Sequence, residues 1–180
     1  FLPVLRMGLE QGLSGLDPYV FRVLRFTLLQ AGLSTLFSLA LGLPLARALA
    51  RQSAFPGRAM LLRLLSLPLA LPAIVVIIGI IEVYGARGWL GGLFDIYGLQ
   101  GILLAHVFFN VPLAIWILEG FISAIPREMD ESARIDGHGI VSFMRRILIP
   151  QIAPGIAVAA FFCFMFSWIE YMLANALTTV

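Results

Sequence analysis

Two polar side chains, His106 and Asn110, lie four residues apart inside a stretch of sequence that is otherwise strongly apolar. Residues at this spacing share one face of a helix, so both side chains point to the same side. Polar groups at membrane depth usually face a cavity or the interior of a bundle, where they can contact a solute on its path. They can equally form hydrogen bonds that hold neighbouring helices together. The sequence leaves both roles open for His106 and Asn110.

Glu170 is a third polar residue within an apolar stretch, and it stands toward the end of that stretch. A carboxylate at the centre of a membrane helix costs roughly 2.5–3.5 kcal/mol, so a lipid-facing position without a partner is disfavoured. We expect Glu170 either to line the cavity that a solute crosses or to reach water at the membrane surface.

These residues do not form the pattern of a metal site or a catalytic centre. No cysteine or acidic residue stands at ligand spacing from His106, and the single Cys163 excludes a disulfide within the chain. An intramembrane enzyme needs a nucleophile with a base, or paired acids or histidines on facing helices. The serines of the apolar stretches carry no such motif. We therefore expect no catalytic residue, no metal and no cofactor.

Composition indicates which elements carry these residues. Of 180 residues, 61% are hydrophobic and 12% are charged, and that charged fraction is about half that of a soluble domain. Apolar stretches of roughly 20 residues can cross a hydrocarbon core of ~30 Å as helices. We predict an all-α, polytopic transmembrane bundle, with kinks at its prolines 68, 72 and 112. Its four spanning stretches are Val23–Ala46, Leu64–Val83, Leu99–Leu118 and Ile152–Ala176.

The distribution of arginine predicts how this bundle is oriented. The connector between the first two stretches carries Arg47, Arg51 and Arg58, and four further arginines lie between the last two. Positively charged connectors tend to remain in the cytoplasm. We therefore expect the connector 123–150 to be cytoplasmic and residues 1–22 to be an extracytoplasmic flank. The net charge of +2 is too small to indicate a nucleic-acid partner.

The cytoplasmic connector contains a polar block, "PREMDESARIDGHGIVSFMRRILIPQIAP", at residues 126–154. Its acidic residues would occupy the first turn of a short helix, near the positive end of the helix dipole. Gly137 suits the left-handed conformation that ends helices. From Ile140 the spacing of apolar residues predicts an amphipathic helix near the membrane surface, and Pro150 and Pro154 mark the turn back into the membrane.

A short, charged helix of this kind is suited to docking into a groove on a partner protein. Ser132 and Ala133 are small, so they would let the surface of another protein approach the helix closely. The alternative is a solvated loop with an incidental tendency to form helix. Spacing alone does not separate the two interpretations.

The block resembles the signature loop of binding-protein-dependent ABC importer permeases. That family pattern reads E-A-A, three residues, G, nine residues, I, one residue, L-P. Here Glu131-Ser132-Ala133 precedes Gly137 by the same spacing, and Ile147 and Ile149-Pro150 follow in register. Serine replaces the second alanine and isoleucine replaces the leucine, and both changes keep the spacing. Asp136, directly before the glycine, also fits many family members.

The resemblance extends to most of the chain. Arg25–Asn110 looks like permeases of the thiamine and iron type, whereas Val111–Val180 looks like those of the carbohydrate and polyol type. The resemblance implies that residues 23–180 are part of a permease domain, that the chain is a fragment, and that the loop 123–150 is its coupling loop. The implied substrate is a carbohydrate, a polyol or a thiamine-like small solute.

The resemblance also implies partners in a bacterial or archaeal inner membrane. The permease would have no chemistry of its own; it would pair with a second permease subunit, a cytoplasmic ATPase and an extracytoplasmic solute-binding protein. Glu131 and Arg134 would contact the ATPase, Ser132 and Ala133 would allow close approach, and Gly137 would set the angle of the hinge. Pro150 would direct the chain back into the membrane.

A secondary transporter, or another polytopic membrane protein without an ATPase, is the alternative. A transporter driven by an ion gradient would show internal repeats and ionisable relays at mid-membrane, and the sequence contains no internal repeat.

Overall fold

The computed structural model describes residues 18–52, 54–85, 88–89 and 98–170. Within these ranges every regular element is a helix. The all-α class predicted from composition is therefore confirmed. Most of the expected flank 1–22 and the end of the fourth apolar stretch, from residue 171 to Ala176, lie outside the described residues.

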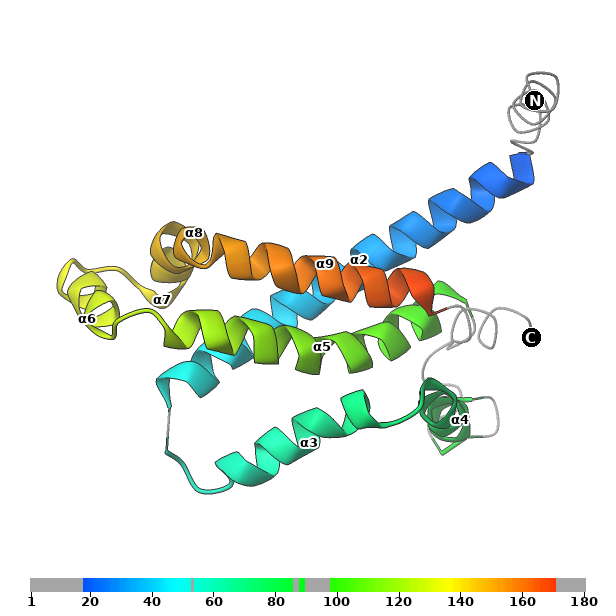
Figure 1. Ribbon diagram of the computed structural model, residues 1–180, viewed down its shortest axis with the longest axis horizontal. Helices are drawn as coiled ribbons and strands as arrows, with labels where there is room; N and C mark the ends of the chain where they lie inside the picture. Colours follow the sequence, from blue (N-terminus) through cyan, green and yellow to red (C-terminus); the bar gives the residue numbers. More distant parts are fainter. Residues whose placement is uncertain (1–17, 53, 86–87, 90–97, 171–180) are drawn as a thin grey trace, which may run out of the picture.

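Three long helices form the body of the bundle: α2 (Pro18–Arg51), α5 (Leu99–Ser123) and α9 (Ala153–Ile169). Helices α5 and α9 run beside each other along the long axis of the molecule, and α2 packs against both and crosses them obliquely (Figure 1). The first and third predicted stretches thus become single helices. Helix α2 begins at Pro18, five residues before the expected start of the membrane domain at residue 23.

Small residues bring these helices close together. Gly42 of α2 lies against Ala114 of α5, where an added Cβ would come within 3.1 Å of the Ala114 Cβ. Gly155, in the first turn of α9, faces Phe121 of α5. Glycine and alanine at such contacts let helix backbones approach and gain van der Waals contact, which is the main attraction between helices in lipid.

The second predicted stretch is divided into α3 (Arg58–Ala70) and α4 (Ala73–Tyr84), which meet at an angle of 107°. The expected kink at Pro72 is therefore a complete break. Leu71, which precedes this proline, is extended at φ −83° and ψ 137°, because the ring of a proline excludes the residue before it from the helical region. Pro68 remains inside α3 and Pro112 inside α5.

Two helices in the described part of the chain, α2 and α5, are long and apolar enough to cross a membrane. Two bent pairs could add one span each: α3 with α4, and the segment Ile140–Gln151 with α9 across an angle of 82°. The described residues therefore provide between two and four spans, and the predicted number of four is the upper value.

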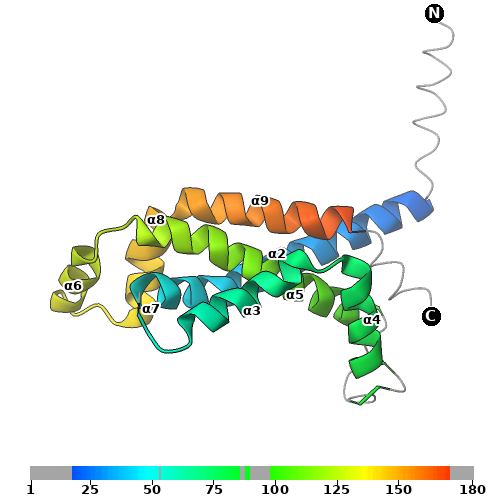
Figure 2. The same cartoon turned by 60° about the horizontal axis from the view of Figure 1, so that its bottom comes forward.

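The polar block forms a helical loop at one end of the bundle (Figures 1 and 2). Helix α6 (Glu128–Ile135) has its acidic residues in the first turn, and Gly137, two residues beyond its last residue, has a φ of +77°. Both features match the prediction. Beyond it the chain forms α7 (Ile140–Phe143), a π-helical turn η1 (Met144–Leu148) and α8 (Ile149–Gln151).

The expected amphipathic helix from Ile140 needs correction. Phe143 and Leu148 are buried, but Ile140 is 72% exposed. The apolar face therefore begins at Phe143 and continues to Leu148, with Met144 and Ile147 partly buried against the same core cluster.

Candidate functional site

Helix α6 presents most of its predicted contact residues to solvent. Glu131, Ser132 and Arg134 are exposed, as are Asp136 and Gly137 at its end. The first turn is acidic and the last turn carries Arg134, so the charges stabilise both ends of the helix dipole. The helix thus offers a surface of alternating charge at the tip of the bundle.

Ala133 does not belong to that surface. Its side chain is 3% exposed and packs in the main core cluster of the bundle. The expectation that Ala133 allows a partner to approach is therefore wrong for this chain. The residue is small because α6 rests on the bundle at this point, and only Ser132 remains as a small outward-facing residue.

Large apolar residues next to Gly137 are strongly exposed, and the sequence reasoning missed them. Ile135 is 86% exposed, Ile140 is 72% exposed and Val141 is 79% exposed. Isolated exposed apolar residues are ordinary, but a group of them around one turn indicates a contact surface. The signal in the sequence is that apolar residues flank "DGHG" on both sides, with Ile135 before it and Ile140 and Val141 after it.

An ion cluster joins α6 to the end of α2. Arg51 pairs with one oxygen of Asp130, and Arg47 Nη2 lies 3.4 Å from the other, Oδ1. These side chains retain only 14–22% of their exposure. Removing one partner of a buried ion pair typically costs about 3–5 kcal/mol, because an uncompensated charge remains; these partly exposed groups fall below that range. The sequence predicts Asp130 only as one of the acidic residues in the first turn of this helix, and its pairing with α2 was missed.

The two arginines make further contacts that extend the cluster. Arg51 Nη1 donates hydrogen bonds to the carbonyls of Ile122 (3.3 Å) and Ile125 (3.0 Å), at the C-terminal end of α5. The guanidinium of Arg47 lies 4.9 Å from the ring centroid of Phe143 in α7, within the range of a cation–π contact. The end of α2 thus contacts α5, α6 and α7.

The last two residues of the family pattern lie where the loop rejoins the bundle. Ile147, in η1, is partly buried against the main core cluster. Pro150 is exposed in α8, shortly before the 82° bend that leads into α9.

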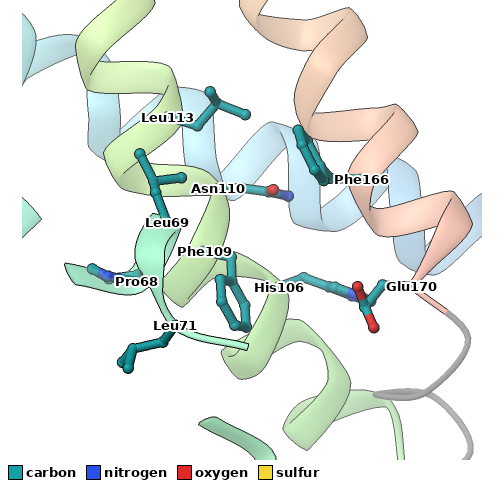
Figure 3. A pocket seen from close by; sticks show the side chains of 9 residues that line it. All are labelled: Pro68, Leu69, Leu71, His106, Phe109, Asn110, Leu113, Phe166 and Glu170. Carbon is teal, nitrogen blue, oxygen red and sulfur yellow. The ribbon is translucent and has the colours of Figure 1, made fainter. Parts of the chain in front are cut away.

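The three polar residues of the apolar stretches meet in one pocket. A cavity of about 200 Å³ lies between the end of α3, the middle of α5 and the end of α9 (Figure 3). His106, Asn110 and Glu170 all line it, together with Phe109 and Phe166. Aromatic and aliphatic walls with a few polar groups are typical of sites for small organic molecules.

Asn110 holds two helices together. Its Nδ2 donates to the carbonyl of Cys163 (3.1 Å) and to the hydroxyl of Ser167 (2.8 Å), both on α9. A matching contact links α2 to α9, where Gln30 Nε2 donates to the Ser167 carbonyl at 2.9 Å. For Asn110 the structure therefore supports the helix-bridging role that the sequence left open.

His106 differs from Asn110 although both share a face of α5. Its side chain is 3% exposed, and neither ring nitrogen has a hydrogen-bond partner among the described residues. Buried polar groups are normally satisfied. His106 thus retains its hydrogen-bonding capacity for the pocket that it lines. The described residues contain no group of three potential metal ligands.

A model of a transport family matches this chain. The family is described as the binding-protein-dependent transport system inner membrane component, and it aligns with residues 38–179, which include the whole loop and the pocket. The chain belongs to this family.

Relatives of this permease family include transporters of two different solutes. The chain is 44% identical to the thiamine transport system permease protein ThiP of Escherichia coli (strain K12) over 161 residues, and 40% identical to that of Brucella abortus (strain 2308) over 164. It is 32% identical to the trehalose transport system permease protein SugB of Mycobacterium tuberculosis (strain CDC 1551 / Oshkosh) over 146 residues. These alignments cover 81–83% of the chain.

The alignments cover a smaller part of the relatives. The chain spans 30% of the length of the two thiamine permeases and 51% of the trehalose permease. The family is a transport family, and its matched region here holds the loop of α6–α8 and the membrane helices that meet it.

Proposed function

We propose that this chain forms part of the membrane-spanning permease of an ATP-driven importer, with α6 as the helix that docks into a cytoplasmic ATPase. The observation that carries the proposal is the surface around Gly137. Exposed charges on α6 and the exposed Ile135, Ile140 and Val141 lie together at the tip of the bundle. A partner groove with apolar walls and a charged rim fits that surface.

The arginine-rich connectors support a cytoplasmic location for this tip. Arg47 and Arg51 at the end of α2, Arg58 at the start of α3 and the arginines of the loop all lie at the same end of the molecule (Figures 1 and 2). Positive charge favours the cytoplasmic side. The partners are then an ATPase at this end, a second permease subunit beside the bundle and an extracytoplasmic solute-binding protein at the opposite end, in a bacterial or archaeal inner membrane.

The pocket between α3, α5 and α9 is proposed to belong to the solute path. His106 offers unpartnered ring nitrogens, and Glu170 offers a carboxylate at the end of α9. Thiamine-like solutes are the first candidates because the thiamine permeases share the higher identity, and a carbohydrate is the second. Uptake of labelled thiamine and of labelled trehalose by proteoliposomes with the complete transporter distinguishes the two.

Gly137→Arg tests the docking role of α6. Gly137 has φ +77°, a conformation that costs residues with a Cβ roughly 1–2 kcal/mol. Arginine would therefore shift the turn after α6 and place a long charged side chain in the docking surface. We expect normal membrane insertion, loss of ATPase co-purification and at least a tenfold fall in ATP-driven solute uptake.

Gly139→Arg is the matched control. Gly139 is exposed and has an ordinary φ of −69°, and, as at Gly137, an added Cβ meets nothing within 4 Å. The substitution adds the same charge two residues away without backbone strain, so we expect smaller losses of ATPase co-purification and of solute uptake. Unchanged ATPase binding and uptake in Gly137→Arg would overturn the docking assignment.

A further inference from the structure

We infer that Arg47, Arg51 and Asp130 form a positioning cluster that fixes the angle of α6 relative to the membrane bundle. The three side chains are contributed by α2 and α6, which are 83 residues apart in sequence at the Arg47–Asp130 contact. The inference concerns how α6 is held, and it rests on the proposed function only for its consequence, the transmission of movement from an ATPase.

Helix α6 needs such an attachment because it is short. It has eight residues, and isolated helices below about 12–15 residues are marginally stable in water. Of its residues, Ala133 alone is fully buried against the bundle. A single small apolar contact leaves α6 free to rotate about that point, so a second contact is required to define its direction.

The ion cluster supplies that second contact. Arg47 and Arg51 are four residues apart and lie on the same face of α2, and each meets one oxygen of the Asp130 carboxylate. One carboxylate held between two guanidinium groups cannot turn without losing one of them. Opposite charges at 14–22% exposure resist separation more strongly than pairs at the open surface.

The same arginines transmit the position of α6 to the membrane helices. Arg51 also binds the carbonyls of Ile122 and Ile125 at the end of α5, and Arg47 also covers the ring of Phe143 in α7. Any displacement of α6 therefore acts on α2 and on the end of α5 together. Such coupled packing passes movement as a rigid body.

The neighbouring acidic residues Asp130 and Glu131 of α6 therefore have different roles. Asp130 is 14% exposed and is used within the chain, whereas Glu131 is exposed and remains available to a partner. Removal of the Asp130 charge should loosen α6 and leave its docking surface intact.

Spin labels on α6 and α2 test the inference. In a Cys163→Ala background, Ser132→Cys on α6 and Leu45→Cys on α2 provide two exposed labelling positions. Double electron–electron resonance is measured on the full chain in lipid nanodiscs. We expect a narrow distance distribution in this parent and at least a twofold broader one in Asp130→Asn, which removes the charge and keeps the shape of the side chain.

Rescue and control variants separate positioning from general stability. The conservative exchange Asp130→Glu keeps a carboxylate beside both arginines and should keep the distribution narrow. Glu119→Gln removes the carboxylate of the Arg58–Glu119 pair, which joins α3 to α5 at 3.8 Å and does not involve α6, so its distribution should equal that of the parent. A distribution in Asp130→Asn as narrow as in the parent would overturn the inference.

Co-purification with the ATPase tests the proposed docking function separately from the positioning cluster. Asp130→Asn should retain the ATPase because Glu131, Arg134 and the exposed apolar residues are unchanged. If the unmodified chain binds no ATPase, the proposed function fails, while the distance distributions still decide whether the cluster positions α6.

Discussion

Asn110 and His106 lie one helical turn apart on α5 and meet different neighbours. The amide nitrogen of Asn110 donates two hydrogen bonds to α9. The ring nitrogens of His106 line a pocket and have no hydrogen-bond partner among the described residues. Asn110 therefore bridges two helices, whereas His106 is proposed to serve the solute path. Substitution by the same apolar residue separates these roles.

Asn110→Leu should lower stability, and His106→Leu should not. Loss of the bonds from Asn110 leaves Ser167 and the Cys163 carbonyl without their donor, and interhelical hydrogen bonds of this kind contribute roughly 0.6–2 kcal/mol in membranes. Leucine at His106 removes a buried polar group that has no partner. Thermal unfolding of the purified protein in detergent measures both.

Solute uptake completes the comparison. His106→Leu should reduce uptake at least fivefold at unchanged thermal stability. A fall in the unfolding temperature equal to that of Asn110→Leu would show that His106 is a structural residue of the bundle.

Glycine and proline determine how the helices pack and where they break. At Pro72 the second apolar stretch becomes two helices at 107°, and at Gly137 a left-handed residue ends α6. At Gly42 and Gly155 the absence of a side chain allows close contact between helices. These positions have different causes: backbone geometry at the first two and the space between elements at the last two.

Gly155→Ala should weaken the contact of α9 with α5. An added Cβ would overlap three atoms of Phe121, one of them its Cβ, so the helices must separate. Overpacking of this kind costs about 1–3 kcal/mol. Gly120→Ala, on α5 with nothing within 4 Å of the added Cβ, is the control and should be neutral. Thermal unfolding provides the measurement, and Phe121→Ala should restore part of the loss in Gly155→Ala.

Arginine is more frequent at one end of the molecule than at the other, where α2 carries Arg22 and Arg25. The arginines of the connectors and the loop gather at one end, where α6, the cluster at Asp130 and the turn between α2 and α3 meet (Figure 1). The opposite end carries α4 and the start of α2. This excess of arginine supports the proposed orientation, with the α6 end in the cytoplasm.

Thiol labelling measures that orientation. In the Cys163→Ala background, Ser132→Cys at the arginine-rich end should react with a membrane-impermeant maleimide only in inside-out vesicles. Arg22→Cys, exposed at the other end of α2, should react only in intact cells or spheroplasts. Cys163 itself is fully buried and should remain unlabelled in the parent. The reverse labelling pattern would contradict the proposed cytoplasmic location of α6.

Much of the fold could be predicted from local sequence. The apolar stretches at Val23–Ala46 and Leu99–Leu118 become α2 and α5 because a long apolar segment satisfies its own backbone only as a helix. The limits of α6 follow from its acidic first turn and from Gly137. The break at Pro72 was placed correctly, but its angle depends on how α3 and α4 pack, which the proline alone does not determine.

The sequence by itself determined the class of the protein, the extent of its apolar helices α2 and α5, and the residue spacing of the loop 123–150, because these depend on hydrophobic length, helix ends and residue spacing. Only the tertiary structure decided which neighbour each polar side chain meets. In the tertiary structure Ala133 packs in the core cluster, and Asp130 forms ion pairs with Arg47 and Arg51. His106 and Glu170 line the same pocket. The physical reason is that helix periodicity defines the side on which a residue lies, whereas the element opposite that side comes from a distant part of the chain.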